Sequence, residues 1–289
     1  MEIVRRLHSM KEFRRQLRGK NRKIGLVPTM GYLHEGHLNL VRRVKEVVDE
    51  TVVSIFVNPT QFGASEDLSR YPRDLTRDTD LLIAEGVDYL FAPEADEMYP
   101  KGPGTFVEVA ELSDRLEGAS RPGHFRGVTT VVLKLLEIVR PTVAAFGQKD
   151  AQQAVIVQRM VRDLMLDVEI LVVPTARDDD DVALSSRNVY LSPDERRAAR
   201  AIPRALRACE AAVADGETDP DAIRAIGRGL LDAEPLLRID YLELVDAELL
   251  RPVPVVAGEL LLVVAVYAGA TRLIDNVRIS VQPGGGARS

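Results

Sequence analysis

Residues 24–37 read IGLVPTMGYLHEGH. The apolar run Ile24–Pro28 predicts a short strand, a turn follows it, and a helix is expected to begin near Gly36–His37. Apolar residues then recur at the spacing of one helix face, at Leu38, Val41, Val44 and Val48. A short buried strand that leads directly into an amphipathic helix is the opening of a βα unit.

The same alternation continues to about residue 173. Further strands are predicted at Val52–Val57, Val87–Ala92, Val143–Phe146 and Val168–Val173, and a helix period at Ala154, Val157, Val161 and Leu164. Strands that alternate with helices imply a mostly parallel sheet, whose ligands bind beyond the carboxyl ends of the strands. We therefore expect a Rossmann-like α/β domain over residues 1–176.

The pattern changes in the C-terminal part of the chain. Ser192–Pro193 is typical of a helix start, and two helices rich in Ala and Arg are expected at 193–214 and 219–232. Three strand-like runs lie close together after them, at Ile239–Val245, Leu260–Tyr267 and Arg272–Val281. The short connections predict antiparallel pairing, so we expect a smaller α+β domain over 177–282 and a disordered tail over 283–289.

The composition excludes several classes of protein. Among 289 residues, 46% are hydrophobic and the net charge is −6, without a basic cluster, which argues against nucleic acid or an anionic membrane as partner. Neither a signal peptide nor an apolar run of about 20 residues occurs, so a cytoplasmic protein is expected. The single cysteine, Cys209, lies in an Ala-rich helical pattern and is expected to pack as a small apolar side chain.

The H-x-G-H spacing places His34 and His37 on either side of a helix start. Both imidazoles can then face a phosphate that the helix N-terminus also attracts, and Gly36 lets a nucleotide approach the backbone. Two surface histidines at a helix cap are the plainer interpretation. A zinc pair is a further alternative, although only His8 and His124 remain as additional histidines.

Other polar segments follow the predicted strands. Asn58 and Gln61 can bind a hydroxyl or carboxylate without adding charge, although Asn-Pro also favours a turn cap. Lys149 suits phosphate oxygens, and Asp150 is expected either to cap the next helix or to hold a ribose.

Three loop segments leave their roles open. Ser185-Ser186-Arg187 can bind phosphate from a flexible loop or be a solvated loop. The acids at 178–181 are either solvated or attract Mg²⁺. The basic stretch Arg121–Gly127 is expected to be a loop that orders a site or a subunit contact, and Tyr71 is either a pocket cover or an exposed turn residue.

Taken together, these segments resemble pantothenate synthetase of the H-x-G-H nucleotidyltransferase superfamily. The similarity runs in order through VPTMGYLHEGH (27–37), VSIFVNPTQF (53–62), LEGASRPGHFRGV (116–128), FGQKDAQQ (146–153), ALSSRNVYLS (183–192) and TRLIDN (271–276). Class I aminoacyl-tRNA synthetases share H-x-G-H, but no Lys-Met-Ser-Lys-Ser-like segment is present here.

The resemblance implies the ATP-dependent condensation of D-pantoate with β-alanine through a pantoyl adenylate, by a homodimer that uses Mg²⁺ with ATP. It implies catalytic roles for His34, His37, Lys149, Ser185 and Arg187. It places pantoate at Gln61 and Gln153, and β-alanine at Gln61. It implies ATP contacts from Met30, Gly31, Tyr32, Leu33, His34, Glu35, Gly36, His37, Gly147, Gln148, Lys149, Asp150, Ala176, Leu184, Ser185, Ser186 and Arg187.

Two positions depart from the family pattern. Gln148 stands where the family usually has Glu, and Asp181 where it normally has Gly. The metal ligands are not assigned by the motifs. Two rival functions stay open at this point: an adenylyltransferase acting on a phosphorylated acceptor, and a nucleotide-binding protein without catalysis.

Overall fold

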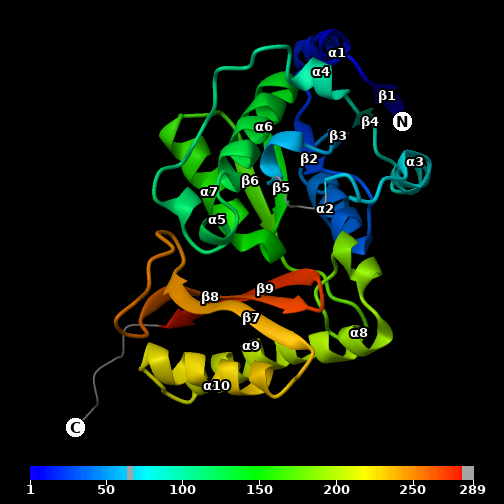
Figure 1. Cartoon of the computed structure of the whole chain (residues 1–289). Helices are drawn as coiled ribbons and strands as arrows, with labels where there is room; N and C mark the ends of the chain where they lie inside the picture. The colour runs from blue at the N-terminus through cyan, green and yellow to red at the C-terminus, as the bar shows by residue number, and fades with distance from the viewer. Residues whose placement is uncertain (64–67, 282–289) are drawn as a thin grey trace. The chain divides into compact units, whose positions relative to one another are not determined.

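The computed structural model describes residues 1–63 and 68–281, which divide into two units, Met1–Thr175 and a second unit that begins at Ala176 (Figure 1). The tail at 283–289, which was expected to be disordered, lies outside the described residues. Among the described helices, none has both the length and the apolar content needed to cross a membrane.

The first unit is built on a six-stranded sheet in which every neighbouring pair is parallel. The parallel α/β sheet predicted from the sequence is therefore confirmed. In spatial order its strands are β1 (Glu2–Val4), β4 (Tyr89–Phe91), β3 (Glu50–Ile55), β2 (Ile24–Thr29), β5 (Val143–Gly147) and β6 (Glu169–Val173).

The strand order reverses at β2, which pairs with β3 on one side and with β5 on the other. In a parallel α/β sheet, the crevice for a ligand opens at this switch point, beyond the carboxyl ends of the strands. The chain continues into Met30 after β2 and into Gln148 after β5. The topology thus brings two of the predicted motifs to the same edge of the sheet.

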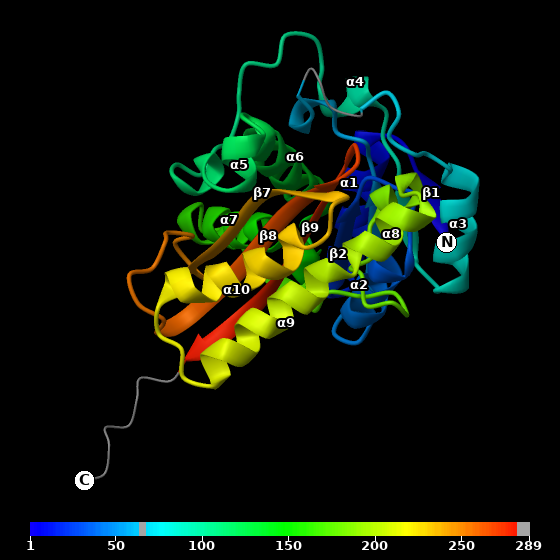
Figure 2. The same ribbon diagram turned by 60° about the horizontal axis from the view of Figure 1, so that its bottom comes forward.

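Helices cover both faces of this sheet (Figures 1 and 2). On one face lie α2 (Glu35–Lys45) and α3 (Leu75–Ala84), whose apolar residues share a core with β2 and β3. The longest helix, α6 (His124–Val139), packs against both α1 (Leu7–Gly19) and α7 (Ala151–Asp163). Shorter elements are η1 (Pro59–Gln61), α4 (Ala95–Met98), η2 (Leu112–Asp114), α5 (Glu117–Ser120) and η3 (Gln148–Asp150).

The second unit contains an antiparallel sheet, as predicted, in the order β7 (Leu237–Asp246), β8 (Gly258–Ala268), β9 (Thr271–Val281). Figure 2 shows α9 (Ala201–Ala214) and α10 (Pro220–Asp232) side by side along this sheet. Cys209 is buried between these helices and donates from Sγ to the carbonyl of Ile223, which confirms its packing role. The unit also contains η4 (Ser186–Tyr190) and α8 (Pro193–Ala199).

Two sequence-based expectations about elements were wrong, and one strand was not anticipated. The helix expected over 193–214 is two helices, because Pro203 lacks the N–H that would bond to the carbonyl of Ala199. The stretch Arg121–Gly127 is not all loop, since α6 begins at His124 after Gly123 adopts a φ of 81°. Strand β1 was not anticipated, because only Val4 of its three residues is buried.

Candidate active site

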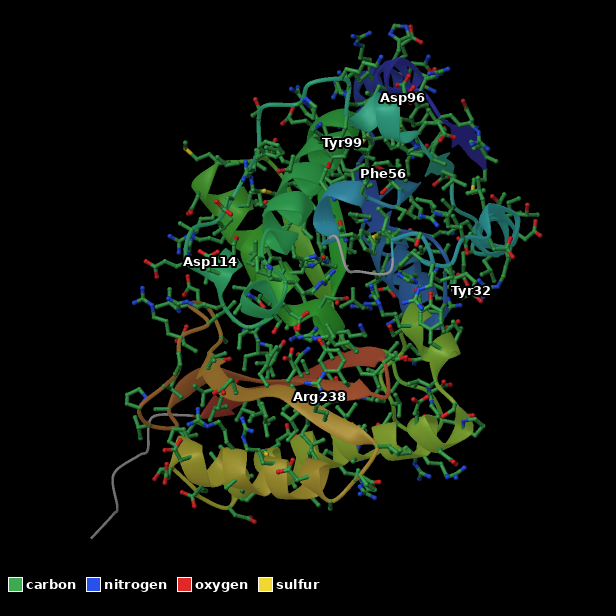
Figure 3. All side chains as sticks on the ribbon, viewed as in Figure 1. Tyr32, Phe56, Asp96, Tyr99, Asp114 and Arg238 are labelled. Atoms are coloured by element: carbon green, nitrogen blue, oxygen red, sulfur yellow. The ribbon has the colours of Figure 1, made fainter. Side chains whose placement is uncertain are left out.

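A buried carboxylate holds the turn that follows β2. Gly31 and Tyr32 have φ values of 85° and 51°, in the left-handed region. Residues other than glycine rarely adopt this conformation, so Tyr32 needs contacts that stabilise it. The backbone N–H groups of Tyr32 and Leu33 each donate to Asp78 at 2.7 Å, and Arg77 donates to the carbonyl of Leu33 at 2.9 Å. Tyr32, labelled in Figure 3, also lies under the Arg77 guanidinium, 5.3 Å from its ring centroid.

Asp78 is a site residue that the motifs missed. Its side chain is 1% exposed, and burial raises its pKa while the two backbone donors oppose that rise. A signal was present in the sequence, because Leu75, Asp78 and Leu82 fall on one face of a helix. An acid in the apolar stripe of an amphipathic helix indicates a buried partner, here the turn after β2.

The two histidines of the H-x-G-H motif lie at the start of α2, as predicted. His34 is the N-cap residue and His37 lies in the first turn, with ring centroids 4.0 Å apart. The backbone N–H of His34 donates to Nδ1 of His37 at 3.3 Å. Because Nδ1 accepts, His37 carries its proton on Nε2 and offers that N–H as a donor.

Both imidazoles are held neutral. Burial lowers the pKa of His34 to about 4, and the positive charges of Lys149 and Arg77 act in the same direction, while Asp150 opposes them. Burial, His34 and Lys149 lower the pKa of His37 well below its ordinary value. At pH 7 the pair can therefore donate hydrogen bonds to a phosphate oxygen without carrying a net charge.

A network of amides follows β3. Asn58 caps η1 and is 1% exposed, and its Nδ2 donates to Oε1 of Gln61 at 3.0 Å. The cap interpretation of Asn58 is confirmed, but the residue also orients Gln61. The Nε2 of Gln61 in turn donates to Sδ of Met30 at 3.2 Å, so the β2 and β3 motifs meet.

The segment after β5 brings a cation to the same edge. Lys149 Nζ lies 3.8 Å from Oδ1 of Asp150, and its charge acts on both histidines. Asp150 is the N-cap residue of α7, but its side chain makes no cap hydrogen bond, so the capping alternative is wrong. A Cβ on Gly147 would meet no described atom within 4 Å, although the φ of −82° does not require glycine. That space is available to a ligand.

The two glutamines at the start of α7 differ. Gln152 is buried, accepts from the N–H of Glu117 and donates to the carbonyls of Leu112 and Arg115, so it orders the segment before α6. Gln153 is half-buried in the first turn of α7.

The remaining predicted residues lie in the second unit, on or after a hairpin at 176–184. Its arms are joined by the N–H of Leu184 donating to the carbonyl of Ala176 at 3.0 Å, and by the bridge between Arg177 and Ala183. Ser185 then caps η4 by accepting from the N–H of Arg187, and Ser186 is buried. Hydrogen bonds therefore fix both the base of this hairpin and the start of η4 that follows it.

Three of the four acids of this hairpin pair with arginines, and two of the four are exposed. Arg196 contacts Asp178 at 2.8 Å and Asp180 at 2.6 Å, and Arg207 pairs with Asp181. Within residues 1–63 and 68–281, no group of three or more His, Cys, Asp or Glu side chains could hold a metal ion. The solvated alternative therefore holds for Asp179 and in part for Asp178, which are exposed, whereas Asp180 and Asp181 are half-buried and paired with arginines from the same unit.

The family model described as Pantoate-beta-alanine ligase matches residues 2–278. The chain belongs to the pantoate-beta-alanine ligase family. It is 54% identical to the pantothenate synthetase of Heliobacterium modesticaldum over 97% of this chain and 100% of the relative, and 54% identical to that of Roseiflexus sp. over 96% and 98%.

Solved structures of the pantoate-beta-alanine ligase family agree with the fold. A pantothenate synthetase from Thermus thermophilus superposes with a TM-score of 0.91 at 46% identity, covering 96% of this chain and 99% of that one. A ligase from Francisella tularensis, solved with beta-gamma ATP and beta-alanine, has a TM-score of 0.79 at 35% identity and covers 96% and 97%.

One departure from the pantoate-beta-alanine ligase pattern has a backbone explanation. Asp181 has a φ of 73°, in the left-handed region where glycine is favoured and where Asp is among the more tolerated substitutes. Arg177 donates to its carbonyl at 3.1 Å and forms a bidentate pair with Asp275 at 2.7 and 3.0 Å. The aspartate therefore keeps the turn that the usual glycine would form.

One further expectation needs correction, and the structure gives a partner to one residue whose role was open. Tyr71 is not an exposed turn residue: it is 6% exposed and packs edge-on against Phe62. His124, for which site and subunit roles were both open, donates from Nδ1 to the carbonyl of Gln61 at 2.8 Å. It therefore supports the Gln61 backbone from the start of α6.

Proposed function

We propose that this member of the pantoate-beta-alanine ligase family condenses D-pantoate with β-alanine at the expense of ATP. The pantoate carboxylate attacks the α-phosphorus of ATP, the bond to the β-phosphate oxygen breaks, and pyrophosphate leaves. The neutral amine of β-alanine then attacks the acyl carbon of the pantoyl adenylate. The C–O bond to AMP breaks, the amine loses its proton, and pantothenate and AMP are released.

One observation carries the proposal: two neutral, half-buried imidazoles lie at a helix N-terminus beside the charge of Lys149, at the switch point of the sheet. The α-phosphate gains charge density at its equatorial oxygens during attack. Fixed donors that need no reorganisation stabilise such a centre best. His34, His37 and Lys149 supply these donors.

The other assigned residues complete the substrate contacts. Met30–His37 and Gly147–Asp150 line ATP in the first unit, and Ala176 and Leu184–Arg187 bind it from the second, with Ser185 and Arg187 on the phosphates. Gln61 and Gln153 hold pantoate, and Gln61 also meets β-alanine. The Francisella ligase solved with beta-gamma ATP and beta-alanine supports ATP and β-alanine as substrates.

Magnesium is proposed as part of the ATP substrate. We propose that Mg²⁺ enters with ATP, bound to its phosphates. We further propose a cytoplasmic homodimer, in keeping with a biosynthetic family. Light scattering of the purified protein measures its assembly, and a monomer at working concentration contradicts that part.

The test is AMP formation from ATP, pantoate and β-alanine. We expect AMP only when both co-substrates are present, and at least about a hundredfold loss of rate in His37→Ala and in Lys149→Ala with folding retained, since one key donor contributes roughly 3–4 kcal/mol. His8→Ala, whose side chain is 78% exposed, is the matched control.

Two results would overturn the proposal. Near-wild-type turnover in both variants contradicts the site assignment. A stable dinucleotide-like product made without β-alanine would instead support an adenylyltransferase acting on a phosphorylated acceptor.

A further inference from the structure

The hydroxyl of Tyr99 is part of the hydrogen-bond network around Gln61, the glutamine assigned to pantoate, although Tyr99 belongs to none of the substrate motifs. Tyr99 directly follows α4 and donates to Oδ1 of Asn58 at 2.8 Å. It also lies 3.1 Å from the hydroxyl of Thr60. Figure 3 labels Tyr99 and, at the end of β3, Phe56, whose ring centroid is 6.3 Å away.

The amide of Asn58 has only one orientation that satisfies its surroundings. Its Nδ2 donates to the carbonyl of Gly127 at 3.2 Å, which can only accept, and its Oδ1 accepts from the backbone N–H of Thr60, which can only donate. A Cβ on Gly127 would lie 2.4 Å from the Thr60 carbonyl, so the glycine lets α6 approach this closely. The second N–H of Asn58 is thereby directed at Oε1 of Gln61.

The orientation of Asn58 then decides the polarity of Gln61. Because Oε1 of Gln61 is engaged as an acceptor, the amide presents Nε2 toward Met30. A thioether sulfur is a weak acceptor, so a carboxylate or hydroxyl oxygen of an acid substrate is the better partner for this N–H. Gln61 is thus set as a donor, and a flipped amide would repel the same oxygen.

The Tyr99 ring is itself fixed from another helix. Lys134 on α6 lies 4.1 Å from the ring centroid and donates to the carbonyl of Met98 at 2.6 Å. Burial raises the pKa of Tyr99, so its hydroxyl stays protonated and can donate through the neutral pH range. Three elements, α4, α6 and η1, therefore converge on one amide.

We propose that Tyr99 is a positioning residue that, through Asn58, keeps Gln61 oriented as a hydrogen-bond donor to the hydroxy-acid substrate. The inference rests on the proposed function and deepens it. Without the phenolic donor, Oδ1 of Asn58 keeps only its contacts to Thr60, and the amide pair loses part of its fixed geometry. The defect should fall on pantoate and spare ATP, since the side-chain contacts of Tyr99 in the described part of the chain are with Phe56, Asn58, Thr60 and Lys134, none of which is assigned to the nucleotide.

The experiment compares Tyr99→Phe with Tyr89→Phe, which removes the same hydroxyl from a tyrosine on β4 that lies against Phe13. Michaelis constants for pantoate and ATP are measured separately. In Tyr99→Phe we expect the KM for pantoate to rise about five- to tenfold, the range for one hydrogen bond to a buried acceptor, and the KM for ATP to change by less than about twofold. Tyr89→Phe should change neither.

Thr60→Val provides a second route, because it removes the other hydroxyl donor to the same Oδ1. It should raise the KM for pantoate as well, and the effects of the two substitutions together should be non-additive, since they share one acceptor. A variant that is only less heat-stable, with both Michaelis constants unchanged, overturns the positioning role.

The two levels of the proposal fail differently. If wild-type protein forms no AMP with pantoate and β-alanine present, the proposed function fails. If the wild type is active and Tyr99→Phe raises the KM for ATP as much as that for pantoate, the function stands and the assignment of Tyr99 to the acid subsite is wrong.

Discussion

Among the turns of this chain that contain left-handed residues, two are held by opposite means. In the turn after β2, Tyr32 has a φ of 51° and is held by its own N–H bonded to the buried Asp78. In the 176–184 hairpin, Asp181 has a φ of 73°, and guanidinium groups from Arg177 and Arg207 surround its carboxylate and carbonyl.

The turn after β2 is fixed more precisely than the 176–184 hairpin. Two backbone N–H groups bound to one carboxylate allow a single geometry, and a group that is 1% exposed is hardly screened by salt. Surface ion pairs exchange partners easily, contribute roughly 0–1 kcal/mol each and weaken in salt. The turn beside the histidine pair is therefore preorganised, whereas the hairpin can adjust.

The strongest test of this contrast is Asp78→Ala. Two hydrogen bonds to a charged acceptor are lost, at about 2 kcal/mol each, so we expect unfolding to become about 4 kcal/mol easier by urea titration. The rate of AMP formation should fall at least about a hundredfold, because the helix start that carries His34 loses its support.

Asp80→Ala, a change to another acid on the same helix, is the control and should leave both quantities near the wild-type values. Retained stability and rate in Asp78→Ala would show that the turn holds itself, and the contrast with the hairpin would disappear.

The sequence indicated the elements whose signals are local. Short runs such as Val143–Phe146 predicted parallel strands because burial on both faces requires continuous apolar residues. The spacing of His34 and His37 predicted a shared helix start because three residues make almost one turn. Proline at 203 could have been used to divide the helix after Ser192.

The residues that sequence reasoning missed act over long separations. Asp78 bonds to an N–H 46 positions away, and Tyr99 reaches an amide 41 positions away. The helical period around Asp78 indicates that this acid is buried, but no pattern names its partner or that of Tyr99, because the partners depend on which loops the strand order brings together. The pairing of Asp178, Asp180 and Asp181 with arginines is hidden for the same reason, because Arg196 and Arg207 lie on later helices.

The histidine pair predicts a second, smaller effect, on the pH dependence of stability. The pKa of His34 is lowered to about 4 in the folded protein, so between that pH and about 6.5 the unfolded chain binds more protons. Stability is therefore lost as pH falls through this window. Between pH 7.5 and pH 5 the loss from His34 should be about 2 kcal/mol, from about 1.5 pH units at 1.36 kcal/mol each.

His34→Asn isolates the contribution of His34. The free energy of unfolding is measured by urea titration at both pH values, and the loss in the variant is subtracted from the loss in the wild type, which removes the contribution of the other titrating groups. His8→Asn is the exposed counterpart. A difference of zero for His34→Asn would mean that its imidazole is protonated in the folded protein, and the neutral-donor role would fail. In the free enzyme, kcat/KM for ATP should likewise stay level through pH 6.5 and fall only closer to pH 4.

The smallest effect is expected for Asp181→Gly, and its dependence on salt matters more than its size. Glycine stabilises the folded state by relieving the left-handed backbone at this position. It also destabilises the protein, because the unfolded chain becomes more flexible and the ion pairs with Arg207 and Arg177 are lost. These contributions are each about 1 kcal/mol and partly cancel. We expect the free energy of unfolding, measured by urea titration, to change by less than about 1 kcal/mol at low salt.

The salt dependence of stability distinguishes the contribution of the ion pairs in this turn from that of its backbone. In about 1 M NaCl, where the screening length falls to roughly 3 Å, the wild type loses its ion-pair term and Asp181→Gly should gain stability relative to it. Asp181→Asn keeps a side chain that tolerates this φ while removing the charge, so it should show the same salt response without the backbone relief. If the difference between wild type and either variant is the same at both salt concentrations, ion pairs do not hold the hairpin turn, and the two turns of this protein are fixed alike.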